Sequence, residues 1–174
     1  MYNDFSLIYD RFQEIDYNKF INFYKEVFYR NNYEPHSIID LGCGSGEITV
    51  LLGREGYDVT GIDISSDMLS IAQNKAFDSG VDITFLNQDM TEFDVLYKAD
   101  AVISSLDCVN YLPCLNDVKE TFSCVYESLK PDGIFIFDIN SEYKLSNILG
   151  NNTFVYQDDE AYCCLLYTSD AADE

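Results

Sequence analysis

The feature that most constrains the fold is the alternation of short apolar runs with stretches of helical periodicity. The five apolar runs span residues 37–42, 58–63, 82–89, 99–107 and 133–140. Each run is far shorter than the roughly 20 residues that a membrane-spanning helix requires. Apolar runs of this length, separated by helices, are typical of parallel strands that helices cover on both faces. The sequence therefore predicts an α/β protein with a doubly wound, mostly parallel sheet.

The segments between these runs carry start and stop signals for helices. Residues 47–54 have apolar side chains at helical spacing. Ser65 is expected to cap a second helix that stops at Gly80, and Asn116 to cap a third that ends before a turn at 130–133. Because the chain has 174 residues, it can hold one α/β unit with a buried core but hardly two.

Composition excludes several classes of function. The chain has 10 basic and 31 acidic residues, a net charge of -21, and no cluster of Lys or Arg. Since affinity for nucleic acid depends on clustered cations, we expect no nucleic-acid partner. A single histidine and the lack of a CxxC pair predict no metal site. The N-terminus does not resemble a secretory signal, so we expect a cytoplasmic protein without membrane contact.

Polar residues follow four of the five apolar runs. Asp40 and a glycine-rich segment close the first run, Asp63 closes the second, residues 88–90 close the third, and 104–111 follow the fourth. In an open parallel sheet, ligands bind beyond the carboxyl ends of the strands, near the point where strand order reverses. These four segments are therefore expected to meet in one binding site.

The glycine-rich segment GCGSG narrows the choice of cofactor. Gly42, Gly44 and Gly46 permit positive φ and let a ligand lie against the backbone. A dinucleotide fingerprint requires a glycine at the position that Glu47 occupies. The Asp40 carboxylate would repel a pyrophosphate, but it suits a ligand that carries an ammonium and a sulfonium. An NAD-dependent oxidoreductase is therefore the less favoured alternative.

Asp63 has the position of an acid that binds ribose. It lies about 20 residues after the first glycine, as in nucleotide-binding α/β proteins. A carboxylate that accepts both ribose hydroxyls makes charge-assisted hydrogen bonds, each of about 1.5–3 kcal/mol. The alternative is that Asp63 interacts with the dipole of the helix that starts after Ser65.

Four blocks in order carry a resemblance to a known family. They read IIDLGCGSGEIT, VTGIDISSDML, FLNQDMTEF and LKPDGIFIFDIN. Over roughly residues 35–140 this set resembles the class I S-adenosylmethionine-dependent methyltransferases. The resemblance implies a Rossmann-like fold, S-adenosyl-L-methionine as cofactor and methyl transfer to an acceptor. The blocks YNDFSLIYDRFQEIDY and SSLDCVNYL further resemble bacterial small-molecule methyltransferases, which implies a small-molecule acceptor.

The same resemblance implies roles for residues at the cofactor site. Asp40, Gly42, Gly44 and Gly46 would shape the methionine end, and Asp63 would hold the ribose.

At the adenine end, the resemblance implies that Ile64 and Met68 flank the ring. Asp89, together with the Met90 amide, would read the amino edge of the adenine.

Two further segments are candidates for the lid and the acceptor site. Tyr9 is expected to lie over the cofactor, whereas most other aromatic residues of the N-terminal segment are expected in the core. Ser105 is expected at the cofactor site, and Asp107, Asn110 and Tyr111 where an acceptor would meet the methyl group. Asp107 is the candidate general base, because no histidine lies in that region.

The domain organisation follows from these segments. We expect a helical lid segment at 1–34, the binding core at 35–140, the start of a truncated acceptor region at 141–163 and a non-native tail at 164–174. The tail, CLLYTSDAADE, resembles a translated sequencing adapter; an ordinary acidic tail is the alternative. The family sheet has seven strands and five are visible here, so the sequence reads as a fragment whose last strands are missing. A cofactor-binding fragment without activity is therefore a second alternative, and the oligomeric state is left open.

Overall fold

The computed structural model describes residues 15–150, 152–157 and 162–166. It contains a unit that spans Ile15–Asp138 and a second unit that includes Ile139–Glu174. In the second unit, the described residues form the π-helix η3 (Lys144–Leu149) and two antiparallel strands, β6 (Thr153–Gln157) and β7 (Tyr162–Leu166). The first unit holds the candidate site and is described below.

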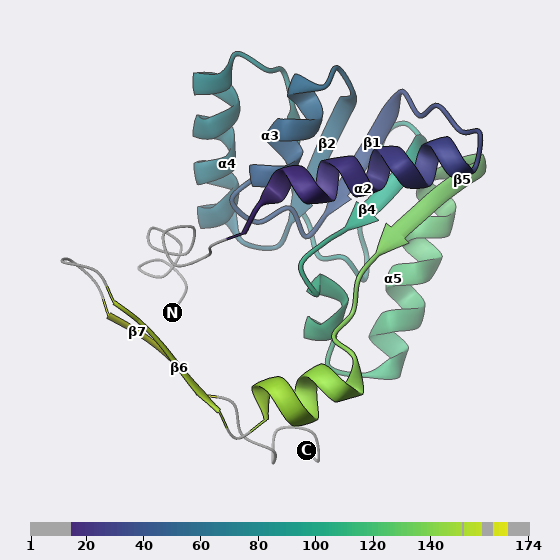
Figure 1. The fold of residues 1–174 in the computed structure, drawn as a ribbon. Coiled ribbons are helices and arrows are strands. Elements are labelled where there is room, and N and C mark those ends of the chain that lie inside the picture. The colour runs from purple at the N-terminus through teal and green to yellow at the C-terminus, as the bar shows by residue number, and fades with distance from the viewer. Residues whose placement is uncertain (1–14, 151, 158–161, 167–174) are drawn as a thin grey trace. The chain divides into compact units, whose positions relative to one another are not determined.

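The first unit is built on a five-stranded parallel sheet (Figure 1). Its strands are β1 (Ser37–Leu41), β2 (Asp58–Asp63), β3 (Thr84–Asn87), β4 (Ala99–Ser104) and β5 (Leu129–Phe137). The spatial order is β3-β2-β1-β4-β5, and every neighbouring pair is parallel. This confirms the predicted doubly wound parallel sheet. The strand order reverses at β1, which places the expected ligand site beyond the ends of β1, β2 and β4.

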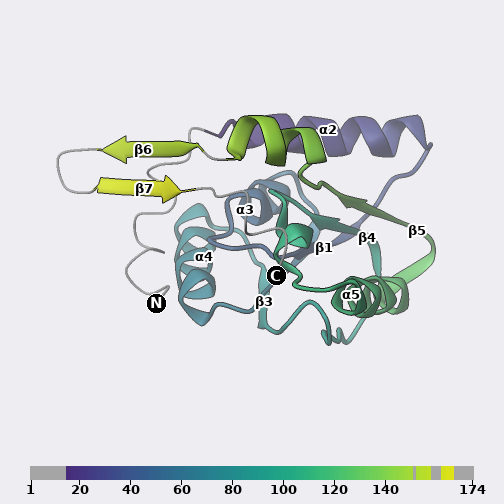
Figure 2. The same cartoon turned by 90° about the horizontal axis from the view of Figure 1, so that it is seen from below.

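Helices cover both faces of this sheet. They are α2 (Tyr17–Arg30), α3 (Glu47–Arg54), α4 (Ser66–Ser79) and α5 (Leu115–Ser128), with the short 3-10 helix η2 (Cys108–Tyr111) after β4. Figure 2 shows α2 and α5 on opposite sides of β4 and β5. Two faces covered in this way explain why the strands read as continuous apolar runs rather than as alternating patterns.

The predicted ends of α4 are confirmed, but the predicted start of α5 is wrong. The Ser65 hydroxyl accepts the Met68 amide at 3.3 Å, and Gly80 ends α4 with φ of 67°. In α5, Asn116 is not the cap, because the helix already begins at Leu115. The Asn116 side-chain amide instead donates to Glu120 at 2.8 Å, one turn along the helix.

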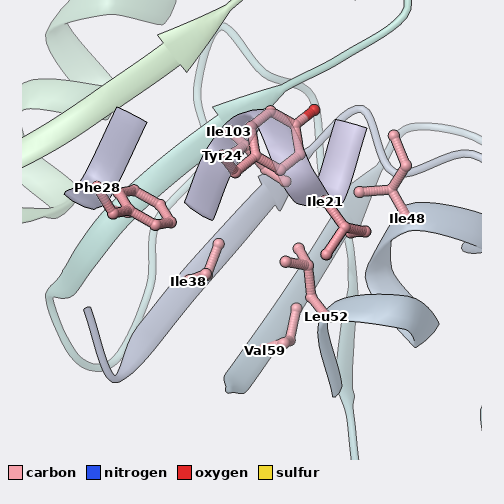
Figure 3. Packing of buried hydrophobic residues seen from close by; sticks show 9 residues of the cluster. Ile21, Tyr24, Phe28, Ile38, Ile48, Leu52, Val59 and Ile103 are labelled. Carbon is pink, nitrogen blue, oxygen red and sulfur yellow. The ribbon is translucent and has the colours of Figure 1, made fainter. Parts of the chain in front are cut away.

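The two layers of the core differ in the helices that supply them. Ile21, Tyr24 and Phe28 of α2 lie over β1, β2 and β4, beside two side chains of α3 (Figure 3). On the other face, Val125 of α5 packs against buried residues of β1, β2 and β4, including Val102. Burying each such side chain stabilises the fold by about 1.5–3 kcal/mol. Tyr24 and Phe28 thus lie in the core, as predicted; Tyr2, Phe5 and Phe12 of the same segment lie outside the described residues.

The turn predicted after α5 lies inside β5 as a bulge. The pairing steps from Ala99 with Leu129 to Ala101 with Ile134, so the partner strand has extra residues between the two pairs. Within them Asp132 has a left-handed φ of 64°. The local turn signal was therefore correct, but strand pairing continues on both sides of it.

Among the described residues, no helix is long and apolar enough to cross a membrane.

The predicted domain boundaries stay a prediction. Residues 164–166 of the expected tail lie in β7, paired with β6.

Candidate functional site

The five parallel strands have their carboxyl ends on the same side of the sheet, which is called the carboxyl edge below. This edge brings the predicted site segments together. Asp40 pairs with Gly61 of β2 and with Ile103 of β4, next to the ends of these strands. Asp63 is the last residue of β2 and pairs with Asn87 of β3. The segments that follow β1, β2, β3 and β4 therefore begin side by side at one edge.

The three glycines after β1 are all left-handed, with φ of 77°, 53° and 81°, but their surroundings differ. A Cβ on Gly42 would lie 2.7 Å from the Cys108 sulfur, and one on Gly46 would lie 2.7 Å from the Cβ of Ala72 in α4. A Cβ on Gly44 would meet no described neighbour within 4 Å. Gly42 and Gly46 are thus required by packing within the chain, whereas Gly44 borders space that a ligand can fill.

The Asp63 carboxylate connects this loop to the start of α4. Its Oδ2 accepts the Gly44 amide at 2.8 Å, and its Oδ1 accepts the Ser65 amide at 2.8 Å. The second bond agrees with the alternative role at the helix start. A carboxylate offers about four lone-pair sites, so these two bonds leave capacity for ribose hydroxyls. The two roles predicted for Asp63 are therefore compatible.

Asp40 lies beneath the glycine loop and is only 2% exposed. The Thr49 hydroxyl, from the first turn of α3, donates to Asp40 Oδ2 at 2.6 Å. Burial raises the pKa of Asp40 to about 7, the Thr49 bond opposes this rise, and the Asp63 charge adds to it. When it is ionised, Asp40 can act on a ligand through its charge, which is strong at a site of low dielectric.

Thr49 was missed by the sequence analysis. A hydroxyl between two buried apolar residues of α3, Ile48 and Val50, is the signal that could have found it.

A hollow of about 440 Å³ lies where the adenine end was expected. It is lined by Ile64, Asn87, Gln88, Asp89, Glu92 and Asp94. Ile64 is 68% exposed, so its apolar side chain is available to the face of a ring. Asp89 Oδ1 accepts the amide and the hydroxyl of Thr91 at 2.9 and 2.8 Å, which fixes the orientation of this carboxylate.

The two methionines predicted at the adenine end lie closer to the core. Met68 is buried in α4, and Met90 packs against the apolar layer beneath α5. For Met90, the backbone amide was the predicted contact, and a side chain packed inward is consistent with it. The role of Met68 beside the adenine stays a prediction.

Ser105 is bonded to a residue that the sequence analysis placed only in the core. The hydroxyls of Tyr24 in α2 and Ser105 after β4 form a buried hydrogen bond. Figure 3 shows the Tyr24 ring in the apolar cluster, with its hydroxyl oxygen at the edge of that cluster. Burial raises the pKa of Tyr24, so its hydroxyl stays protonated at neutral pH. The aromatic spacing of α2 predicted burial of this ring but not its polar contact.

The segment that follows Ser105 has an unusual backbone. Leu106 and Asp107 are consecutive left-handed residues, with φ of 59° and 55°. Such residues cost about 1–2 kcal/mol each and persist where surrounding contacts hold them. The Asp107 amide donates to Asp138 Oδ2 at 2.9 Å, and the Cys108 thiol contacts the Gly42 carbonyl at 3.3 Å. The expected acceptor segment is thus attached to the end of β5 and to the glycine loop.

The remaining predicted site residues are less defined. Asn110 and Tyr111 lie in η2, and both are exposed. Asp107 as general base stays a prediction, and Tyr9 lies outside the described residues.

Similar proteins were found by sequence and by structure. The sequence profile of the family described as "Methyltransferase domain" matches residues 38–133. The methyltransferase-like protein YqeM of Bacillus subtilis is 46% identical over 130 residues, which cover 73% of this chain and 51% of that protein. The crystal structure of an S-adenosylmethionine-dependent methyltransferase from Clostridium acetobutylicum is 38% identical with a TM-score of 0.84, and the match covers 95% of this chain and 68% of that one.

A further relative is the ubiquinone biosynthesis O-methyltransferase of Erwinia tasmaniensis. It is 32% identical over 119 residues, which cover 65% of this chain and 47% of that protein. The chain spans about half the length of this relative and of the Bacillus subtilis one. The profile match and the likeness to the Clostridium acetobutylicum enzyme show that the chain belongs to the class I S-adenosylmethionine-dependent methyltransferases.

Proposed function

We propose that the protein binds S-adenosyl-L-methionine across the carboxyl ends of β1, β2 and β3 and transfers its methyl group to a small-molecule acceptor. One observation carries the proposal. The Asp63 carboxylate bonds the amide of Gly44, the glycine that borders open space. This arrangement puts an acidic group beside a backbone that a ligand can approach closely. Asp40 lies under the same loop, and two carboxylates fit a cationic ligand better than a pyrophosphate.

When bound, S-adenosyl-L-methionine supplies a methyl carbon on a sulfonium, which is strongly activated toward in-line displacement. The chain then has to orient the acceptor and exclude water, and such positioning can contribute about 7–11 kcal/mol. The segment that follows β4 is fixed at Ser105, Asp107 and Cys108, as positioning requires. In this proposal Asp107 accepts a proton where the acceptor must lose one.

Two observations support a small-molecule acceptor. The net charge of -21 disfavours polyanionic partners. The name of the Erwinia tasmaniensis relative places its reaction in ubiquinone biosynthesis. The cytoplasmic location and the absence of a nucleic-acid partner stay predictions, and the activity of a longer protein that contains this chain is part of the proposal.

Calorimetric titration with S-adenosylhomocysteine and with NAD tests the cofactor. We expect the first to bind and the second not to bind. Asp63→Ala should weaken S-adenosylhomocysteine binding by about 100-fold or more, because two hydrogen bonds to a charged acceptor are lost. Asp58→Ala, at the other end of β2 and exposed, is the matched control and should leave the affinity unchanged.

Circular dichroism of each variant separates lost binding from lost structure. Binding of NAD but not of S-adenosylhomocysteine would support the oxidoreductase alternative, and an unchanged affinity in Asp63→Ala would remove this residue from the site. The alternative of binding without catalysis is tested by mass spectrometry. Conversion of S-adenosylmethionine to S-adenosylhomocysteine in a small-metabolite extract requires an active enzyme.

A further inference from the structure

Helix α3, which begins directly after the glycine loop, carries a buried hydroxyl in its first turn. Thr49 has no exposed surface, and its neighbours Ile48 and Val50 are buried apolar residues. A buried hydroxyl without a partner costs free energy, but Thr49 has one, the Asp40 carboxylate at 2.6 Å. Thr121 of α5 is equally buried, and its hydroxyl has no hydrogen-bond partner among the described residues. Burial of a threonine in this fold therefore does not by itself require such a bond.

The groups that face Asp40 come from five segments of the chain. They are Thr49 in α3, Asp63 at the end of β2, Tyr24 in α2, and the thiols of Cys43 and Cys108.

Tyr24 and the two thiols do not offset the charge of Asp40. Burial, followed by the charge of Asp40 among the causes, raises the pKa of Cys43 and of Cys108. Burial likewise raises the pKa of Tyr24. All three groups thus keep their protons at neutral pH and remain uncharged. The Thr49 hydroxyl is the neighbour that favours the charged form of the Asp40 carboxylate.

We propose that Thr49 is a positioning residue for cofactor binding. Its hydroxyl orients the Asp40 carboxylate and makes its ionisation easier. Binding of the ammonium at the methionine end of the cofactor is coupled to release of the Asp40 proton to solvent wherever the free protein holds that proton. This proposal rests on the proposed function and adds to it a residue that touches Asp40 rather than the ligand.

The direction of the pH dependence follows from burial. Because the pKa of Asp40 is raised to about 7, the free protein holds a proton on this group below that pH. A cationic ligand prefers the ionised carboxylate, so below about pH 7 binding must expel the proton and the affinity falls as the pH falls. Removal of the Thr49 hydroxyl takes away a bond to the charged form. The pKa of Asp40 then rises further, and the affinity begins to fall at a higher pH.

Calorimetric titration with S-adenosylhomocysteine from about pH 5.5 to 8 tests this proposal. Titration in two buffers of different ionisation enthalpy gives the number of protons released. For the wild-type chain we expect a fall of about tenfold per pH unit below about pH 7, with close to one proton released. Thr49→Val should move the midpoint up by about one unit, which lowers the affinity by about fivefold at pH 7 and by about tenfold at pH 6 and below. Thr49→Ser should restore both.

Two further variants complete the design. Asp40→Asn should bind weakly at every pH and release no proton. Thr121→Val removes an equally buried hydroxyl without a described partner, so its pH profile should match that of the wild type.

A Thr49→Val variant that loses affinity equally at every pH, with an unchanged midpoint and no rescue by serine, would overturn the proposal. A pH-independent affinity of the wild-type chain would overturn it as well, while leaving the proposed function intact. No binding of S-adenosylhomocysteine at any pH would overturn the proposed function together with this proposal. If Thr49→Val does not fold, the wild-type proton count and Asp40→Asn decide the outcome.

Discussion

Two aspartates on neighbouring strands lie at opposite ends of their strands, one at the carboxyl edge of the sheet and one at the amino edge. They differ in the hydrogen-bond donors that surround them. Asp40 is near the carboxyl end of β1, and Asp100 is near the amino end of β4. Asp100 Oδ2 accepts the amides of His36 and Ser37 at 3.0 and 2.9 Å and the Ser37 hydroxyl at 2.8 Å. Its Oδ1 accepts the Lys130 ammonium at 2.9 Å. Each oxygen of Asp100 is thus held by donors of the chain itself.

The pKa values follow from this contrast. Burial would raise the pKa of Asp100, but the bonds from Ser37, Lys130 and His36 outweigh it and hold the pKa well below its usual range. The pKa of Asp40 is raised instead, because burial dominates and Thr49 opposes it only in part. At the amino edge, an aspartate stabilises the fold; at the carboxyl edge, the same residue type carries a charge that the fold alone does not stabilise. Such an imbalance is typical of a ligand site.

The largest effect is expected from Asp100→Ala. It leaves several donors without their acceptor, so the free energy of unfolding at pH 7 should fall by about 3–5 kcal/mol in urea titrations. The S-adenosylhomocysteine affinity should remain within about twofold, because the proposed site lies at the other edge. Asp58→Ala, exposed at the same edge, is the control and should change stability by less than about 0.5 kcal/mol.

The dependence of stability on pH tests the role of Asp100 in a second way. The folded pKa of Asp100 is lowered, so its contribution to stability is present above the unfolded value of about 4 and is lost as the pH falls toward the folded value. Asp100→Ala should abolish this part of the acid sensitivity. A larger effect on cofactor affinity than on stability would mean that the two edges are not independent.

Gly44→Val should affect binding most strongly at the carboxyl edge. The side chain would enter the open space at this position and add left-handed strain of about 1–2 kcal/mol, so we expect S-adenosylhomocysteine affinity to fall at least about 100-fold. Gly46→Val is the matched comparison. Its side chain would collide with Ala72, so it should lower Tm much more than Gly44→Val does. Retained binding in Gly44→Val would show that the loop does not face the cofactor.

Asp40→Asn should stabilise the protein while it weakens cofactor binding. The folded pKa of Asp40 is raised to about 7, whereas the unfolded carboxyl group ionises near about 3.9. Between these values the native state binds the extra proton, so Asp40 makes stability decline as the pH rises through this range. Asparagine removes this decline, and we expect a gain of about 1–3 kcal/mol at pH 8 in urea titrations. The same slope of stability against pH in both proteins would contradict this account.

The smallest effect is expected from Lys130→Met. Lys130 is 43% exposed at its side chain, and its ion pair with Asp100 is therefore partly screened by solvent. We expect a loss of about 0.5–1 kcal/mol, reduced further at high salt. A loss as large as that of Asp100→Ala would show that the ion pair, rather than the backbone donors, dominates the amino edge.

The sequence was sufficient to predict the sheet and the strand ends that lie side by side where the ligand is proposed to bind. Continuous apolar runs, the glycines and the acid at the end of β2 are local signals, and they predict strand and loop without tertiary information. The contacts that shape the site were not predictable in this way. Tyr24 and Ser105 are 81 positions apart, and their bond depends on how α2 crosses the sheet. Asn116 was mistaken for a cap because a cap and a first-turn residue have the same local pattern.

The parallel pairing of β1 with β4 also has a consequence for synthesis on the ribosome. Ser37 at the start of β1 bonds to Asp100, 63 positions later. At about 5–20 residues per second, β1 waits about 3–13 s for its second neighbour while α3, β2, α4 and β3 are made. During this interval the edge of β1 that later pairs with β4 has no partner from its own chain. An unpaired apolar edge attracts other chains, but residues 1–98, made before β4, already carry 17 acidic and 7 basic residues, and this net charge of -10 opposes association of nascent copies.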